Sequence, residues 1–483
     1  MHSETLERAR LARDARFDGR FYIGVLTTGI YCRPICPAVA PKRENVQLYP
    51  SAAAAGEAGF RPCLRCRPEC SPGTPAWAGT STTVSRGLRL IDGGVLDDGN
   101  VEVLAAKLGV TSRHLRRLFT RHVGASPQAV AHTRRLHFAK RLIDETALSM
   151  SDVAIAAGYG SVRRFNAAFR TTYDRTPREL RQSRAGKSRR SGRAGLTVRV
   201  PYRSPYSWTD VLRFYGMRAI PGVEEIDGDV YRRSLRLGEA ECIIELQAHA
   251  NDGFLSLRMQ NVPTERIYEV VQKVRDVFDL DAPIDDICAA LATDDRMRAL
   301  LSLQAGVRVP GCWDGFELAV RAILGQQISV KAATTLSGRV ASRYGTPLRE
   351  PVGSLTHFFP DAAQLVRARF NNIGIVQSRA DTLRRLAGAV LTRNVSFDPL
   401  QDMQDFHEQF TAIKGIGDWT AQYVMMRALK NPDAFPASDL GLVKALCPGE
   451  RVSPATLATR AENWRPWRAY AAMLLWGSSN SGG

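Results

Sequence analysis

Four cysteines near the start of the chain have the spacing of a metal site. Cys32 and Cys36 form a CxxxC pair, and Cys63 and Cys66 form a CxxC pair further along. Two short pairs of this kind can give four thiolates to one tetrahedral Zn²⁺. The chain has nine cysteines, an odd number, and five of them cluster before residue 71, which favours a metal over disulfides. The fifth, Cys70, is either a spare ligand or an unrelated thiol.

A second stretch that could do chemistry, residues 410–442, contains a tight turn between two helical runs. The turn reads Lys414-Gly-Ile-Gly417, and its two glycines suit backbone positions that need positive φ. A helix is predicted to follow over residues 418–430. Backbone amides in such a turn, at the start of a helix, form a site for an anion, and we expect a phosphate there.

A carboxylate and aromatic side chains follow this turn. Trp419, Tyr423 and Met426 recur at helical spacing, and Asp439 follows a proline-bearing loop that can face the same space. A carboxylate beside an aromatic pocket suits a reaction that builds positive charge next to a flat, stackable base. Two plainer interpretations stay open at this point, since the aromatic residues could belong to the core and Asp439 could simply cap the helical run 440–446.

The chain as a whole is strongly basic. Its 483 residues suffice for three or four domains, and 66 Lys and Arg residues against 48 Asp and Glu residues give a formal charge of +18. This excess indicates a polyanion as partner, most simply nucleic acid. The rival class is a basic membrane-binding protein, but no apolar run is long enough to span a membrane and the first 20 residues are too charged for a signal peptide. We therefore expect a soluble, cytoplasmic protein.

Two stretches between the cysteine pairs and the tight turn have a DNA-binding pattern. Residues 103–119 and 153–169 each read as a short helix, a glycine turn and a second helix with basic exposed positions. One such stretch could be an ordinary helical corner, but two at this separation resemble the AraC-type DNA-binding domain. The resemblance implies second helices that begin near Ser112 and Ser161. The basic side chains expected at the major groove or its phosphates are Arg113, Arg116, Arg163 and Arg164.

The cysteine pairs lie within longer motifs. These motifs are Asp18-Gly-Arg-Phe21, Thr27-Thr-Gly-Ile-Tyr-Cys-Arg-Pro34, Arg43-Glu-Asn45 and Ala58-Gly-Phe-Arg-Pro-Cys-Leu-Arg-Cys66. They resemble the N-terminal domain of the Ada family of alkylation-damage regulators. The resemblance implies that Cys32, Cys36, Cys63 and Cys66 bind one Zn²⁺ and that Cys32 accepts a methyl group irreversibly from a methylated DNA phosphate, since a zinc-bound sulfur stays deprotonated and nucleophilic. Taken without the resemblance, the quartet reads as a purely structural zinc site. The basic residues expected to hold the phosphate are Lys42, Arg43, Arg61, Arg65 and Arg67.

Four motifs of the C-terminal half occur in a fixed order. They are Phe316-Glu-Leu-Ala-Val-Arg-Ala-Ile-Leu-Gly-Gln-Gln-Ile-Ser329, Ile413-Lys-Gly-Ile-Gly-Asp-Trp-Thr-Ala-Gln-Tyr423, Phe435-Pro-Ala-Ser-Asp439 and Trp464-Arg-Pro-Trp-Arg-Ala-Tyr470. Over residues 196–476 the chain resembles the 3-methyladenine DNA glycosylase II family, which is AlkA-type and of the helix-hairpin-helix superfamily. The resemblance implies that Asp439 is the catalytic carboxylate, which stabilises an oxocarbenium-like sugar. It implies a base pocket of Trp419, Tyr423 and Trp476 and DNA contacts by Gln327, Lys414, Gly415 and Gly417.

Departures from the patterns of related proteins refine this expectation. Trp419 stands where bifunctional relatives place a Schiff-base lysine, so hydrolysis by water is expected. Only Cys447 follows the catalytic region, too few ligands for an iron–sulfur cluster. Leu440 stands where an aromatic residue is expected, and Gln327 stands where an apolar residue often fills the gap left by a flipped nucleotide, which leaves the substrate range open. A Pro-Cys-His-Arg motif is absent from the sequence, so O6-alkylguanine acceptor activity is not predicted.

These patterns predict a multidomain fold that is mainly α with α+β parts. Alternating apolar and polar residues at 196–200, 225–236, 241–247 and 253–259, with a turn at Asp227-Gly228, predict a small antiparallel sheet packed by a helix over 264–278. Residues 71–85 read as a linker, and beyond residue 283 the pattern is helical almost throughout. The predicted domains are a zinc domain at 1–75, a double helix-turn-helix at 80–182, a basic linker at 183–195, a β-rich subdomain at 196–282 and a helical helix-hairpin-helix glycosylase part at 283–483.

The function predicted is that of a DNA alkylation repair and response protein. It would hydrolyse the N-glycosidic bond of alkylated purines of the 3-methyladenine and 7-methylguanine type in duplex DNA, and would also accept methyl groups and bind promoter DNA. The expected partners are double-stranded DNA and RNA polymerase, without a membrane, and the chain is expected to be a monomer. One alternative is a transcription regulator whose glycosylase half only binds DNA. Another is a glycosylase whose front half is a passive DNA tether.

Overall fold

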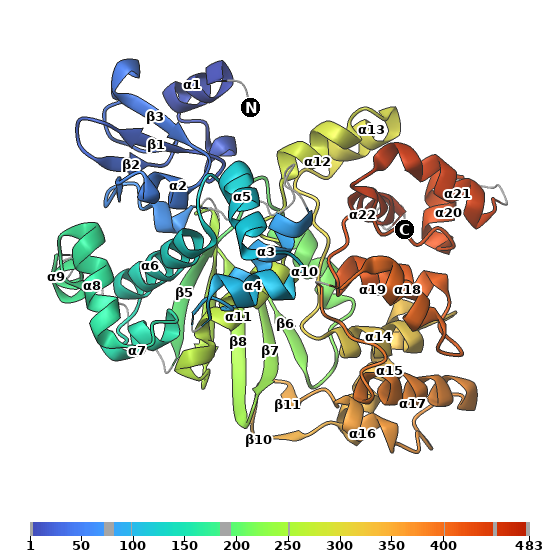
Figure 1. The fold of residues 1–483 in the computed structure, drawn as a ribbon. Helices are drawn as coiled ribbons and strands as arrows, with labels where there is room; N and C mark the ends of the chain where they lie inside the picture. Colours follow the sequence, from blue (N-terminus) through green and yellow to red (C-terminus); the bar gives the residue numbers. More distant parts are fainter. Residues whose placement is uncertain are drawn as a thin grey trace. The chain divides into compact units, whose positions relative to one another are not determined.

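The structure is a computed structural model that describes residues 3–71, 82–97, 99–183, 195–249, 252–399, 401–447 and 452–479. The chain divides into two compact units (Figure 1). Unit 1 consists of Met1–Arg203 and Gly253–Gln272, and unit 2 consists of Ser204–Asp252 and Lys273–Gly483. The predicted basic linker 183–195 falls outside the described residues except at its two ends.

Unit 1 begins with a small sheet that carries the cysteine quartet. Its strand order is β3-β1-β2-β4, with β2 parallel to β4 and the other pairs antiparallel. The side chain of Ser51 caps a helix against this sheet by accepting a hydrogen bond from the amide of Ala54. Tyr22, Tyr31 and Tyr49 form the core beneath. The elements are α1 (Ser3–Ala12), β1 (Tyr22–Val25), β2 (Ile30–Cys32), β3 (Val46–Tyr49), α2 (Ala52–Glu57), β4 (Arg61–Pro62) and the 3-10 turn η3 (Pro68–Cys70).

Two helix-turn-helix motifs follow in unit 1. The second helix of the first motif begins at Ser112, and that of the second motif begins directly after Ser161, which caps it, so both predicted starts are confirmed. Gly109 and Gly158, with φ of +68° and +80°, make the turns. The predicted linker ends earlier than expected, because Thr82–Asp92 form a helix that buries Val84 in the first motif's core. The helices are α3 (Thr82–Asp92), α4 (Val101–Lys107), α5 (Ser112–Val123), α6 (Pro127–Glu145), α7 (Met150–Ala156), α8 (Val162–Tyr173) and α9 (Pro177–Gln182).

Helix α6 packs its polar side chains against the cysteine-bearing sheet. The hydroxyl of Tyr31 is hydrogen-bonded to Nε2 of His137 over 2.8 Å. Lys140, which is 1% exposed, donates to Asp144 over 2.6 Å, and Arg67 lies 3.0 Å from the same carboxylate. These buried ion pairs join the segment after Cys66 to the helix-turn-helix region within one unit.

Unit 1 also contains the first strand after the basic linker. Strand β5 (Leu196–Pro201) pairs antiparallel with β9 (Phe254–Gln260), which is followed by the 3-10 turn η4 (Thr264–Arg266) and by α11 (Ile267–Val277), whose residues 273–277 belong to unit 2. The amide of Arg199 donates to Glu145 on α6 over 2.9 Å, and the side chain of Arg141 donates to the carbonyl of Arg199. Arg203, only 7% exposed, donates to the carbonyl of Asp18 over 3.2 Å. The strand is therefore held by both α6 and the cysteine-bearing module.

Unit 2 combines a β-meander with a helical array. Strands β6 (Glu224–Asp227), β7 (Val230–Leu237) and β8 (Ala240–Ala248) pair antiparallel, and the predicted turn at Gly228 has a φ of +61°. The helices are α10 (Trp208–Gly216), α12 (Ile284–Leu291), α13 (Asp295–Leu303), α14 (Gly315–Gly325), α15 (Val330–Tyr344), α16 (Ala362–Val366), α17 (Gln377–Leu391), α18 (Met403–Thr411), α19 (Asp418–Arg427), α20 (Leu440–Leu446), α21 (Pro454–Arg460) and α22 (Arg468–Ser479). The mainly helical, multidomain fold class is confirmed.

One feature of unit 2 departs from the prediction. A hairpin of β10 (Pro347–Val352) and β11 (Leu355–His357) interrupts the region beyond residue 283, which was predicted to be helical almost throughout and in which no hairpin was indicated. Leu348 and Leu355 are buried beside Ile243 of β8 in a small cluster. The pairing depends on this packing rather than on a local alternating pattern, which explains why the sequence did not indicate it.

Candidate active site and metal centre

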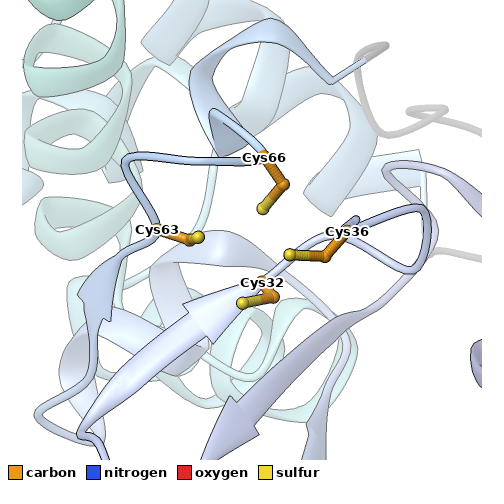
Figure 2. A group of neighbouring side chains, drawn as sticks. All are labelled: Cys32, Cys36, Cys63 and Cys66. Carbon is orange, nitrogen blue, oxygen red and sulfur yellow. The ribbon is translucent and has the colours of Figure 1, made fainter. Parts of the chain in front are cut away.

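The four predicted zinc ligands meet at one point in unit 1. Their sulfur atoms all lie within 4.8 Å of one another (Figure 2). Tetrahedral Zn²⁺ with Zn–S bonds of about 2.3 Å needs sulfur atoms about 3.8 Å apart, so the quartet fits the ion. Cys32 ends β2, Cys36 follows in the next loop, and Cys63 and Cys66 follow β4. The quartet supports one Zn²⁺, and Cys70 is not part of it.

Backbone amides support two of the four sulfurs. The amide of Arg33 donates to Sγ of Cys66 over 3.3 Å, and the amide of Arg65 donates to Sγ of Cys63 over 3.4 Å. Both of these sulfurs belong to buried residues, whereas Cys32 and Cys36 are half-buried. Donors that point at sulfur stabilise the thiolate form that a metal ligand needs. The predicted nucleophile, Cys32, is thus one of the two less buried residues of the quartet.

The basic residues predicted around this quartet differ in their exposure and in their ion pairs. Lys42, Arg61 and Arg65 are exposed. Arg43 is exposed as well and lies 3.5 Å from a carboxylate oxygen of Glu7. Arg67, which was expected with these residues to hold phosphate, forms ion pairs with Glu69, Asp144 and Glu145, and its contact with phosphate stays a prediction.

The basic residues predicted to contact the major groove lie on the outer faces of the two second helices. Arg113 and Arg116 on α5, and Arg163 and Arg164 on α8, are all exposed. Arg116 also lies 3.3 Å from Glu102 of α4. Surface ion pairs of this kind are weak, so this contact can be exchanged for a phosphate.

The glycine turn between α18 and α19 is only partly as predicted. Gly415 has a φ of +101°, and a Cβ there would lie 2.1 Å from Oγ1 of Thr382, so glycine is required. Gly417 has a φ of −104° and is the N-cap of α19, with open space where a Cβ would stand. The expectation that both glycines need positive φ is therefore wrong for Gly417. Its φ is one that other residues adopt readily.

Side chains from other elements form hydrogen bonds to this turn. Nε2 of the Gln326 side chain donates to the carbonyl of Gly415 and to Oγ1 of Thr420, both over 3.1 Å, and the hydroxyl of Thr382 donates to the carbonyl of Lys414 over 3.2 Å. The side chains of Lys414 and Gln327 are exposed. Gln327 has a φ of +58°, an uncommon value for a residue with a side chain. The residues predicted to contact DNA thus lie on a rigid, outward-facing edge.

Asp439 is the centre of the second site. Its Oδ2 accepts the indole N–H of Trp419 over 2.9 Å, and its Oδ1 accepts the indole N–H of Trp476 over 2.8 Å. Oδ1 also accepts the amide of Leu442 over 3.0 Å, so Asp439 is the N-cap of α20 as well. Asp439 therefore caps a helix and also lies beside the aromatic side chains, so the two interpretations of this residue do not exclude each other. Two predicted pocket residues, from α19 and α22, are brought directly to it.

The aromatic side chains form a compact group beside this carboxylate. The rings of Trp419 and Tyr423 are stacked, with 5.3 Å between centroids and 7° between planes, and Trp476 lies edge-on to Tyr423 at 6.4 Å. All three are partly buried against the core. Met426, which shares their helical spacing, is 1% exposed and belongs to that core. Leu440 is 74% exposed next to the carboxylate, in the position where the sequence comparison expected an aromatic side chain.

Two arginines beside Tyr423 were missed by the sequence analysis. Arg427 donates to the hydroxyl oxygen of Tyr423, and its Cζ lies 5.2 Å from the centre of that ring. Burial acts to raise the pKa of the Tyr423 phenol, but the positive charges of Arg427, Arg218 and Arg321 outweigh it and leave this pKa below its ordinary value. The i,i+4 spacing of Tyr423 and Arg427 was a signal for part of this group, but nothing in the sequence links them to Arg218.

Four segments of the chain match known protein families. Residues 5–69 match the metal-binding domain of Ada, residues 104–183 match a helix-turn-helix domain, residues 197–314 match the AlkA N-terminal domain, and residues 320–469 match the helix-hairpin-helix base excision DNA repair superfamily. The class of protein is thus a base excision repair fold joined to an Ada-type zinc domain and a helix-turn-helix domain.

Similar proteins share this organisation. A protein of Mycobacterium tuberculosis named "Probable bifunctional transcriptional activator/DNA repair enzyme AlkA" is 40% identical over 98% of this chain and 96% of its own length. This chain belongs to that family of bifunctional transcriptional activator/DNA repair enzymes. The "DNA-3-methyladenine glycosylase 2" of Escherichia coli is 32% identical over 57% of this chain and 95% of its own length. The solved 3-methyladenine DNA glycosylase of Archaeoglobus fulgidus shares the fold, with a TM-score of 0.52 and 20% identity over 59% of this chain and 98% of its own.

The family and its domains make this a DNA-binding protein. Among the described residues, no helix is both long and apolar enough to cross a membrane. The excess of basic over acidic residues suits contact with the negatively charged DNA backbone.

Proposed function

We propose that unit 2 is a monofunctional DNA glycosylase that hydrolyses the N-glycosidic bond of alkylated purines, of the 3-methyladenine and 7-methylguanine type, in duplex DNA. The observation that carries this proposal is the carboxylate of Asp439, held by two indole N–H groups of the aromatic group. All of its hydrogen-bond partners are donors, which suits a carboxylate that only accepts. Relatives of this chain named as 3-methyladenine glycosylases support the same reaction.

The proposed reaction follows from the arrangement of charge. The flipped base enters between the aromatic rings, where stacking is favoured by the positive charge of an alkylated purine. The bond between C1′ and the base nitrogen breaks with its electron pair going to the base, which leaves as a neutral molecule. The negative charge of Asp439 stabilises the cationic sugar that remains. Water then adds to C1′ and loses a proton, and the product is an abasic site.

Hydrolysis by water is the proposed outcome because position 419 holds tryptophan. A lyase of this superfamily needs a lysine amine there to form a Schiff base. The indole N–H of Trp419 instead donates to Asp439 and orients the carboxylate. The strand is therefore expected to stay intact after base release.

Asp439→Asn tests the assignment. The side-chain amide would present an NH2 donor to one of the two indole N–H groups and remove the negative charge, so we expect base release from duplex DNA with one 7-methylguanine to fall by about 100-fold or more. Binding to duplex DNA with an abasic site should be retained. Asp433→Asn is the matched control, because Asp433 forms its ion pairs with surface Arg465 and with Arg468 and not with the aromatic group, and its excision rate should stay within about twofold. Unchanged excision by Asp439→Asn would defeat the assignment, and no excision by the wild-type protein would favour a regulator whose glycosylase half only binds DNA.

We also propose that Cys32 is a single-turnover methyl acceptor. The observation that favours it is that Cys32 is only half-buried, although it belongs to the quartet of sulfurs that fits a zinc ion. The sulfur attacks the methyl carbon of a DNA methylphosphotriester, an S–C bond forms as the C–O bond breaks, and the negative charge passes from sulfur to the phosphate oxygen. Zinc bound by the quartet keeps the sulfur deprotonated and ready to react. The product is a neutral thioether, so repulsion between this module and the DNA backbone decreases.

Mass spectrometry of the intact, zinc-loaded protein tests this step. After incubation with methylphosphotriester DNA, we expect one added methyl group, located on Cys32. Cys70→Ser is the matched control and should accept the methyl group as the wild type does, since Cys70 lies outside the quartet. Absence of the adduct would leave a structural zinc domain and a passive DNA tether.

The third part of the proposal concerns the contacts of the helix-turn-helix region with promoter DNA. We propose that α5 and α8 read promoter DNA through Arg113, Arg116, Arg163 and Arg164, that RNA polymerase is a partner at these promoters, and that the chain acts as a monomer. Loss of a base-reading arginine should relax sequence preference, whereas loss of a phosphate contact should weaken binding to all sequences and flatten its salt dependence. Footprinting at several salt concentrations separates the two.

A further inference from the structure

Arg427 is a buried cation at the base of the aromatic group. It is the last residue of α19, one turn beyond Tyr423, and it is 3% exposed. Its Nε donates to the carbonyl of Pro310 over 2.7 Å, and one terminal nitrogen donates to the carbonyl of Gly311 over 2.9 Å. The other terminal nitrogen donates to the hydroxyl oxygen of Tyr423. The planar fork of the guanidinium thus connects a loop to one ring of the pocket.

The environment of this guanidinium is unusual for a buried charge. No ion pair between Arg427 and a carboxylate occurs in the part of the chain that the structure describes, whereas buried charges are normally paired. The charge is instead met by two carbonyls, the phenol oxygen and the ring of Phe214, whose centre lies 4.8 Å from its Cζ. Arg218 lies over the same ring at 4.0 Å and adds a second positive charge.

Packing and stability alone do not require an arginine at position 427. An apolar side chain of the same length would fill the volume without the cost of burying an uncompensated charge. The two carbonyls fix the guanidinium in place, because each accepts from a different nitrogen. The third donor is then fixed in direction, and it meets the only polar atom of Tyr423. The ring of Tyr423 is parallel to Trp419, which in turn donates to Asp439.

We propose that Arg427 is a positioning residue for base excision. It acts through the hydroxyl oxygen of Tyr423, which it holds so that the Tyr423 ring stays stacked on Trp419 and the pocket keeps its shape while Asp439 faces the sugar. This inference rests on the proposed glycosylase function and adds a residue that does not touch the substrate. Small errors in placement can cost about 100-fold in rate, so an effect on the chemical step is expected.

The test is a double-mutant cycle of Arg427→Met and Tyr423→Phe. In single-turnover excision of 7-methylguanine at saturating protein, Arg427→Met should lose about 30-fold in rate with little change in the protein concentration that half-saturates the reaction. Phenylalanine at 423 lacks the oxygen on which Arg427 acts. In that background Arg427→Met should therefore lose less than about threefold. Arg427→Lys keeps a cationic donor but not the fork, and it should recover part of the lost rate.

Arg308→Met is the matched control. Arg308 is also 3% exposed and also donates to loop carbonyls, those of Gly306, Val307 and Pro205. It should lower the unfolding temperature and leave the excision rate within about twofold. Equal losses from Arg427→Met in the wild-type and Tyr423→Phe backgrounds would overturn the inference and leave a structural arginine. Absence of excision by the wild-type protein would instead overturn the proposed function, so the two failures are distinguishable.

Discussion

The indole N–H of Trp476 donates to Oδ1 of Asp439 over 2.8 Å, which connects the end of α22 to the N-cap of α20. Trp476→Phe keeps an aromatic ring and removes the donor. We expect base excision to fall by about 10-fold or more, because a hydrogen bond to a charged group contributes about 1.5 kcal/mol or more. Single-turnover excision of 7-methylguanine from duplex DNA measures this. Affinity for abasic-site DNA should change little.

A second indole provides the control for this variant. Trp464 is 3% exposed and donates to Asp294 over 3.2 Å, away from the aromatic group. Trp464→Phe should lower the unfolding temperature and leave excision within about twofold. If both variants lost excision equally, loss of stability rather than the contact to Asp439 would be the cause.

The two glycines of the turn should respond differently to alanine. Gly415→Ala forces a Cβ to within 2.1 Å of Oγ1 of buried Thr382, at a φ of +101°. We expect a loss of about 1–3 kcal/mol in the free energy of unfolding and weaker binding to abasic-site DNA. Gly417→Ala meets open space at a φ of −104° and should change this free energy by less than about 0.5 kcal/mol. Denaturant unfolding of both variants distinguishes them, and equal losses would contradict the assignment.

Removal of a zinc ligand should abolish metal binding by unit 1. Cys36→Ser leaves three thiolates, so we expect the purified variant to contain no stoichiometric zinc and its first module to unfold at lower temperature. Cys70→Ser should keep one zinc per chain, since burial raises the pKa of the Cys70 thiol to about 11 and it lies outside the quartet. Native mass spectrometry and calorimetry measure both properties. Loss of zinc from Cys70→Ser would show that the quartet is incomplete.

His137 should make the stability of unit 1 depend on pH. Burial, assisted by nearby Arg141 and Lys140 and opposed by Glu69, lowers the pKa of His137 from 6.5 to about 4. The unfolded chain therefore binds a proton first as the pH falls, so the contribution is present above pH 6.5 and is lost toward pH 4. Between pH 7 and pH 5 we expect His137 to cost about 2 kcal/mol of stability.

His137→Gln is the comparison for this pH dependence. Glutamine can keep a hydrogen bond to the hydroxyl of Tyr31 but does not titrate. Unfolding of both proteins by denaturant at several pH values should show a steeper loss in the wild type. Parallel curves would show that His137 keeps an ordinary pKa in the folded protein.

Local spacing accounts for what the sequence could predict. Each cysteine pair, the glycine turn and the face that carries Trp419 and Tyr423 are encoded within a few residues, so their residue types and spacing were sufficient. Trp476 lies 37 residues beyond Asp439 in sequence, and only the family resemblance indicated it. The helix starts at Ser112 and after Ser161 were indicated by the resemblance to AraC-type domains, and in the structure a hydroxyl cap precedes each first turn.

Contacts between distant segments account for what was missed. The sequence did not indicate the ion pairs of Arg67, because its partners Asp144 and Glu145 come from α6, more than 70 residues later. The sequence also did not single out Arg427, since the carbonyls that it binds lie 116 and 117 residues earlier. The end of α19 at Arg427, rather than at residue 430, follows from the left-handed conformation of Lys430, whose φ is +56°. Such partners depend on the fold and leave no local pattern.

The anchoring of β5 decides where this protein can be cut into fragments. A division at the basic linker would look natural from the sequence, but Glu145 and Arg141 would lose their hydrogen bonds to the backbone of Arg199, and the carbonyl of Asp18 would lose its bond to Arg203. A fragment that stops near residue 183 would expose these buried polar groups to solvent. Preparations intended to isolate methyl transfer from base removal are better made by silencing one site with a point mutation in the intact chain.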